Sequence, residues 1–112
     1  MIYWYSDLYM DEKVAKHPKK CKKRVTARRL WKKSYVAITL ALNEKNLFEM
    51  METRQLFFRR YAYLDLYVVG LAANQKEAGE LLQQMVLDMW RLDSSVRPYQ
   101  YFVKEKFSGK IE

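Results

Sequence analysis

Eleven lysines and arginines lie between Lys13 and Lys33, and no aspartate or glutamate lies among them. The other 10 bases face all 13 acids of the chain, so this segment accounts for the net charge of +8 and the remainder carries −3. Such a concentrated positive charge attracts polyanions, for example nucleic acid or an anionic lipid surface. The alternative is a solvated basic face that keeps the protein soluble, and the charge count gives the two readings equal weight.

The leading hypothesis for function is a small, non-enzymatic nucleic-acid-binding module. In this hypothesis the cations neutralise phosphates, while a tryptophan stacks on a base or anchors the segment. The predicted contact residues are Lys19, Lys20, Lys22, Lys23, Arg24, Arg28, Arg29, Trp31, Lys32 and Lys33. An exposed Trp31 ringed by cations would favour nucleic acid, whereas a buried Trp31 with dispersed cations would favour the second hypothesis.

That second hypothesis is a protein-interaction or self-assembly module with no role in nucleic-acid binding. The aromatic segment 2–9, or an apolar surface at Phe48 and Leu56, would then hold two molecules together. The basic segment would dock on an acidic partner or simply improve solubility. Peripheral membrane binding ranks third, because the basic segment lacks the large apolar face of an interfacial helix.

Catalytic and metal-binding patterns are weak in this sequence. His17 and Cys21 are four residues apart, but two ligands do not close a zinc site and the neighbouring lysines repel a cation. His17 is the single histidine, so a nucleophilic Ser or Cys has no other imidazole to act as its base. The three glycines, Gly70, Gly79 and Gly109, form no phosphate-binding loop. We therefore expect no catalytic residue, metal or cofactor, and a protein that is not an enzyme.

The cellular location is predicted from three features of the sequence. Cys21 is the single cysteine, which excludes an intramolecular disulfide and fits a reducing compartment. The first residues lack the basic leader and apolar run of a signal peptide. No apolar stretch approaches the ~20 residues that a bilayer span requires. These features predict a cytoplasmic protein.

The clearest structural pattern is a buried strand at 66–72 followed by an amphipathic helix. Asn74 and Glu77 have the spacing of a capping box, in which the Asn side chain accepts a backbone N–H of the first helical turn. Apolar residues then recur every three or four positions, as on the buried face of a helix. They are Ala78, Leu81, Leu82, Met85, Met89 and Leu92.

The other elements are predicted from similar patterns. Aromatic and β-branched residues predict strands at 2–9 and 35–42, and a short strand at 99–103. A second Asn-x-x-Glu pattern, at 46–49, predicts a helix that continues to about Tyr61. Pro18 suits the first position of a helix reaching about Arg29, in which Cys21 and Val25 would touch the body of the protein.

Together these elements predict a single small α/β domain spanning residues 1–112. About four strands alternate with helices in the order β-α-β-α-β-α-β, which predicts a largely parallel sheet with helices packed on it. The basic segment 13–33 is expected to be partly ordered until an anion binds, because like charges three and four residues apart oppose helix formation. The tail 104–112 has little apolar material and is expected to fray.

Overall fold

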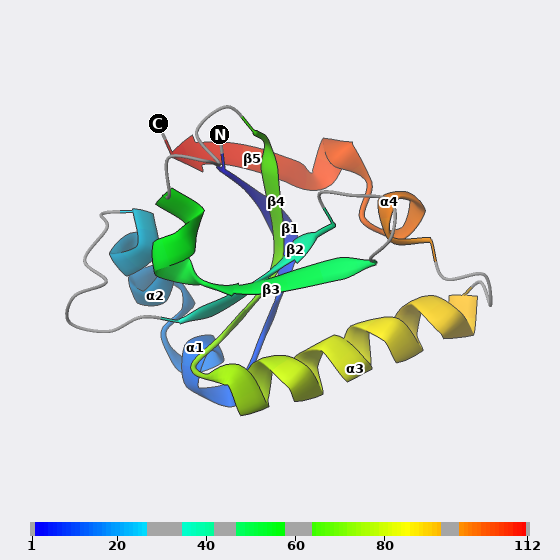
Figure 1. The fold of residues 1–112 in the computed structure, drawn as a ribbon, viewed down its shortest axis with the longest axis horizontal. Helices are drawn as coiled ribbons and strands as arrows, with labels where there is room; N and C mark the ends of the chain where they lie inside the picture. The colour runs from blue at the N-terminus through cyan, green and yellow to red at the C-terminus, as the bar shows by residue number, and fades with distance from the viewer. Residues whose placement is uncertain (1, 27–34, 42–46, 58–63, 93–96, 112) are drawn as a thin grey trace.

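A five-stranded mixed sheet forms the centre of the computed structural model (Figure 1). The structure describes residues 2–26, 35–41, 47–57, 64–92 and 97–111. The strands are β1 (Ile2–Met10), β2 (Val36–Leu40), β3 (Phe48–Glu52), β4 (Leu66–Ala72) and β5 (Phe107–Ile111). The helices are α1 (Glu12–Lys16), α2 (Pro18–Thr26), α3 (Gln75–Leu92) and α4 (Pro98–Tyr101), with short 3₁₀ turns η1 (Thr53–Phe57) and η3 (Lys104–Lys106).

The strand order across the sheet is β3-β2-β4-β1-β5. Only the β1–β4 pair is parallel among these five strands, and the other three pairs are antiparallel. The predicted largely parallel sheet is therefore wrong. The prediction needed a crossover helix between β2 and β4, but β3 occupies that part of the chain and pairs with β2 as it reverses direction.

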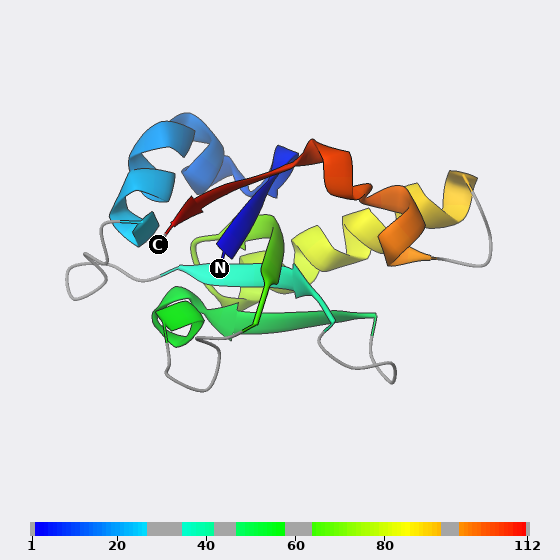
Figure 2. The same cartoon turned by 90° about the horizontal axis from the view of Figure 1, so that it is seen from above.

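Both faces of the sheet are covered, because neighbouring side chains on a strand point to opposite faces. On β2, Ala37 belongs to an apolar cluster shared with α1, α2 and η1, whereas Ile38 and Leu40 belong to a second cluster shared with α3. Trp4, on β1, is 2% exposed in the first cluster. Both views show α1 and α2 at one end of the molecule and α4 at the other (Figures 1 and 2).

A β-bulge in β4 lets α3 lie close to the sheet. Val68 pairs with Thr39 and Gly70 pairs with Ile38, so Val69 is an extra residue on this strand. A Cβ on Gly70 would lie 2.5 Å from Cε of Met85, which is fully buried on α3. The absence of a side chain at Gly70 thus makes room for the central anchor of α3.

Several predicted elements are confirmed. The predicted strands at 2–9, 35–42 and 66–72 correspond to β1, β2 and β4, and the capped helix is α3. Its cap has the expected geometry, because the Glu77 N–H donates to Oδ1 of Asn74 at 2.9 Å. Helix α2 begins at Pro18 as predicted and extends to Thr26, where the described segment ends.

Three predicted elements are wrong. The segment expected to be a helix from Leu47 to Tyr61 forms β3 and η1 where the structure describes it. The expected strand at 99–103 falls in α4, which starts at Pro98 and is followed by the buried Phe102. The tail expected to fray contains β5, because its strand pairs with β1 and Phe107 packs on the ring of Tyr5 at 5.2 Å.

The core-facing stripe of α3 is confirmed only in part. Ala78, Met85 and Met89 are buried against the sheet, and Leu82 is half-buried against the second cluster. Leu92, at the end of the helix, is 77% exposed, so its predicted place in the core is wrong. The stripe predicts the packing of the middle of the helix but not of its last turn.

Candidate nucleic-acid interface

Helix α2 is attached to the body of the protein along a narrow apolar line. Cys21 is 6% exposed and Val25 is fully buried, and both belong to the first apolar cluster. This confirms their predicted contact with the core. The Cys21 N–H donates to the carbonyl of His17 at 3.0 Å and closes the first turn, in which Pro18 needs no hydrogen-bond acceptor.

Lysines cover the opposite surface of α2. Lys19, Lys20 and Lys23 are exposed, and the preceding helix α1 adds the exposed Lys13 and Lys16. The sequence of α2 contains no acid. Cys21 and Val25 hold the inner side of the helix on the core, so these lysines lie on its exposed side.

The remaining predicted contact residues are not all covered by the structure. The side chains of Lys22 and Arg24 lie outside its described part. So do Arg28, Arg29, Trp31, Lys32 and Lys33, including the Trp31 environment that would separate the two hypotheses. The structure therefore brings Lys19, Lys20 and Lys23 together on one helix and leaves the other seven positions as predictions.

Asp11 is the acid that positions the start of the basic segment. Its Oδ1 accepts the Val14 N–H at 2.9 Å and caps α1, while its Oδ2 accepts the Ala73 N–H at 3.0 Å. The carboxylate is 8% exposed and joins α1 to the turn between β4 and α3. Both oxygens are thus engaged with backbone amides.

A second polar group joins β1 to α3 and α4. The Tyr9 hydroxyl donates to Oδ2 of Asp88 at 2.6 Å and lies 3.1 Å from the Tyr101 hydroxyl. Burial, reinforced by the hydrogen bonds to Asp88 and Tyr101, raises the pKa of Tyr9 far above its ordinary value. The phenol, which is protonated at neutral pH even at its ordinary pKa, acts as a tie between β1, α3 and α4.

Sequence reasoning missed this network because its members are distant in the chain. Tyr9 and Asp88 are 79 residues apart, and Tyr9 and Tyr101 are 92 apart. No local spacing connects them. In the structure, Asp88 also accepts a hydrogen bond from Nε2 of Gln84 at 2.8 Å.

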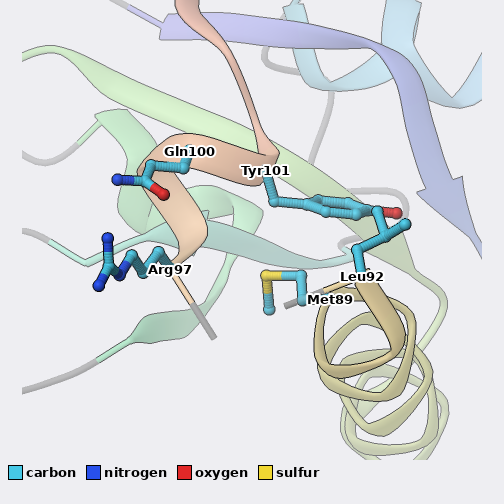
Figure 3. A pocket seen from close by; sticks show the side chains of 5 residues that line it. All are labelled: Met89, Leu92, Arg97, Gln100 and Tyr101. Atoms are coloured by element: carbon cyan, nitrogen blue, oxygen red, sulfur yellow. The ribbon is translucent and has the colours of Figure 1, made fainter. Parts of the chain in front are cut away.

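A small pocket of about 170 Å³ lies where α3 meets α4. Figure 3 shows Met89 in the middle of its lining, with Tyr101 and Leu92 on one side and Arg97 and Gln100 on the other. The guanidinium of Arg97 and the amide of Gln100 point away from Tyr101 (Figure 3). The polar groups of this pocket do not converge on one point, so its geometry defines no reaction centre.

The apolar surface predicted at Phe48 and Leu56 is not present. Leu56 is 4% exposed in the first apolar cluster, whereas Phe48 is half-buried against the second, on the other face of the sheet. The two side chains therefore cannot form one contact surface. A different apolar surface, on the outer side of α3, includes Leu87 and Trp90, which are 49% and 58% exposed.

The described ranges contain neither a metal-binding cluster nor a membrane-spanning helix. There, no three His, Cys, Asp or Glu side chains gather closely enough to hold a metal ion, and His17 is exposed while Cys21 is buried. No helix in that same part of the chain is both long and apolar enough to cross a membrane. The chain matches no model of a known protein family, no curated protein and no solved structure.

Proposed function

We propose that this protein is a non-enzymatic nucleic-acid-binding module and that α2 is the centre of its binding surface. The observation that carries the proposal is the division of α2 into two sides. Cys21 and Val25 are buried in the core, and Lys19, Lys20 and Lys23 face solvent on a helix without acids. A row of cations on a fixed helix suits a phosphate backbone, which carries regularly spaced negative charges.

Binding by such a surface is driven by the release of counterions from the nucleic acid. Each phosphate that is neutralised contributes about −0.9 to the slope of log K against log salt for duplex DNA, and about −0.7 for a single strand. The five exposed lysines of α1 and α2 would give a duplex slope of roughly −4 to −5 if each meets one phosphate.

Trp31 and the cations that follow α2 enter the proposal from the sequence alone. A tryptophan that stacks on bases contributes to single-strand binding without adding to the salt slope. Trp31→Ala should therefore weaken single-strand binding by about 1 to 3 kcal/mol and leave the slope nearly unchanged. The proposal also includes a cytoplasmic location, which the buried, unpaired thiol of Cys21 supports.

The test is fluorescence anisotropy with labelled single- and double-stranded oligonucleotides over a salt series. The α2 variant carries Lys19→Gln, Lys20→Gln and Lys23→Gln. Its matched control carries Arg54→Gln, Lys76→Gln and Lys106→Gln, which remove the same charge from exposed positions elsewhere. We expect the α2 variant to lose up to about 3 from the slope, and the control to keep the wild-type slope.

Two results would contradict the proposal. One is the absence of binding to either oligonucleotide at low salt. The other is an equal loss of slope in the two variants, because net charge rather than the position of α2 would then govern binding.

A further inference from the structure

Helix α3 carries a second apolar stripe that does not face the sheet. Its buried side holds Ala78, Met85 and Met89. About a third of a turn away, Val86 is half-buried, Leu87 is 49% exposed and Trp90 is 58% exposed. A helix with polar residues outward needs no partner, whereas a helix that is apolar on both its inner and outer sides exposes surface that water disfavours.

A hollow of about 530 Å³ lies along this outer stripe. Its lining residues are Gly79, Leu82, Gln83, Val86 and Leu87, all on α3. Gly79 lines one end of the hollow, and a Cβ built at this position would meet no atom within 4 Å. Glycine inside a helix is less stable than alanine. Gly79 therefore lowers the stability of α3, and it leaves open space above the backbone.

The helix also carries the side chain that would fill such a hollow. Trp90 follows Gly79 by eleven residues, which is about three turns of α-helix, so the two lie on one line roughly 16 Å apart. When two copies of α3 pair antiparallel about a twofold axis near the midpoint of that line, each Trp90 meets the partner's Gly79. The stripe is therefore complementary to itself.

The charges beside the stripe favour the same arrangement. Glu80 and Arg91 are also eleven residues apart. Glu80 directly follows Gly79 and Arg91 directly follows Trp90, so both lie on the same side of the line that joins Gly79 and Trp90. In an antiparallel pair, Glu80 lies opposite the partner's Arg91 twice, whereas a parallel pair would bring no Glu80 opposite an Arg91. The side chain of Arg91 is 69% exposed, and its contact with Asp88 is long at 3.9 Å, so its guanidinium is accessible for this pairing.

We propose that α3 is the contact surface of a homodimer, in which two copies of this chain pair through antiparallel α3 helices. Trp90 of each copy fills the hollow above Gly79 of the other, and Glu80 pairs with the partner's Arg91. The contact uses no residue of α2, so it holds whether or not α2 binds nucleic acid.

The test is sedimentation equilibrium of the full chain between about 5 and 200 µM. We expect the wild-type mass to approach twice the monomer mass of 13.6 kDa. Glu80→Arg alone and Arg91→Glu alone each place like charges together and should raise the dimer dissociation constant by at least about tenfold. An equimolar mixture of these two variants restores opposite charges at both contacts, so it should regain the dimer mass.

A further variant tests the hollow. Gly79→Leu should remove the dimer because the new side chain occupies the space that Trp90 needs, and it should not lower the thermal midpoint of the monomer, since that position is open. Arg97→Glu, a charge reversal on an exposed residue away from the stripe, is the control and should dimerise as wild type does.

The proposal is overturned by a wild-type mass that stays at the monomer value across the whole concentration range. It is equally overturned by a dimer that Gly79→Leu leaves intact, or by a mixture of the two charge-reversed variants that dimerises no better than either alone. Each of these results would show that α3 does not hold two copies of this chain together in the proposed way.

Discussion

Helices α2 and α3 are both fixed to the sheet by buried apolar side chains, yet they present opposite chemistry to solvent. Helix α2 is held by Cys21 and Val25 and exposes lysines. Helix α3 is twice as long, is held by three buried residues, and exposes Leu87 and Trp90. The inner side of a helix thus determines where it is held, and the outer side determines what it can bind. The comparison separates the surface that we propose for polyanions from the surface that we propose for self-association.

The largest expected effect is at the anchor of α3. Met85→Ala should lower the free energy of unfolding by about 2 to 5 kcal/mol, because it removes a fully buried side chain packed above Gly70 and leaves a cavity. Urea unfolding measures this, with Leu92→Ala as a control because Leu92 is mostly exposed. Similar losses in both variants would show that α3 is not fixed through its middle turns.

The anchor of α2 should contribute less. Val25→Ala deletes two buried methyl groups and should cost roughly 2 kcal/mol, including the cavity that remains. If the loss is below about 0.5 kcal/mol, the usual range for exposed sites, then α2 is not held on the core and the basic surface is not rigid. Lys16→Ala, at an exposed position on α1, is the control.

The cap of α3 comes next in size. Asn74→Ala removes the acceptor of the Glu77 N–H and should cost about 1 kcal/mol. Asn74→Asp keeps a side-chain acceptor and should recover most of that stability. If the urea midpoint and slope of Asn74→Ala equal those of the wild type, the Asn74 side chain does not stabilise the fold.

The smallest effect on stability is expected on the outer side of α2. Replacing Lys19, Lys20 and Lys23 by Gln should change the free energy of unfolding by less than about 0.5 kcal/mol, because exposed charges contribute little. Thermal and urea unfolding both measure it. A marked stabilisation would instead indicate that repulsion among these lysines opposes the fold when no anion is bound.

Two copies of one sequence pattern show how much of the fold could be predicted. After Asn74, apolar residues recur every three or four positions along α3, and this local pattern agrees with the tertiary packing up to Met89. After Asn46 the same Asn-x-x-Glu pattern leads into β3, where each residue from Phe48 to Glu52 pairs with one on β2. Pairing with a neighbouring strand outweighed the local preference for a helix, which a capping pattern alone cannot reveal.

The C-terminal strand β5 could not be predicted because distant residues fix it. Phe107 packs on Tyr5 and on Tyr67, with ring centroids 5.2 and 5.1 Å apart, which holds β5 against the sheet. For α4 the sequence did contain a local signal, because Pro98 suits the first turn of a helix. The aromatic composition of 99–103 favoured a strand, but the segment forms a helix that is followed by the buried Phe102.

The two candidate surfaces also differ in how far the sequence predicted them. The outward lysines of α2 could be predicted, because charge counts and the position of Pro18 need no tertiary information. The helical spacing of α3 also predicted which side faces the sheet, because Met85 and Met89 are buried, but it did not show that Leu87 and Trp90 on the other side stay exposed. Likewise, Leu56 appeared free in the sequence and is buried in the first cluster.

Hydrogen–deuterium exchange with and without a saturating oligonucleotide tests the central claim most directly, because it locates binding on the chain. If the nucleic acid holds α2 through its lysines, local opening of that helix must release the ligand, and amide exchange in 18–26 slows by up to about a hundredfold at a free ligand concentration of 100 Kd. Exchange in α3 should stay unchanged. Protection confined to α3, or no protection on α2 at saturation, would contradict the assignment of α2 as the binding surface.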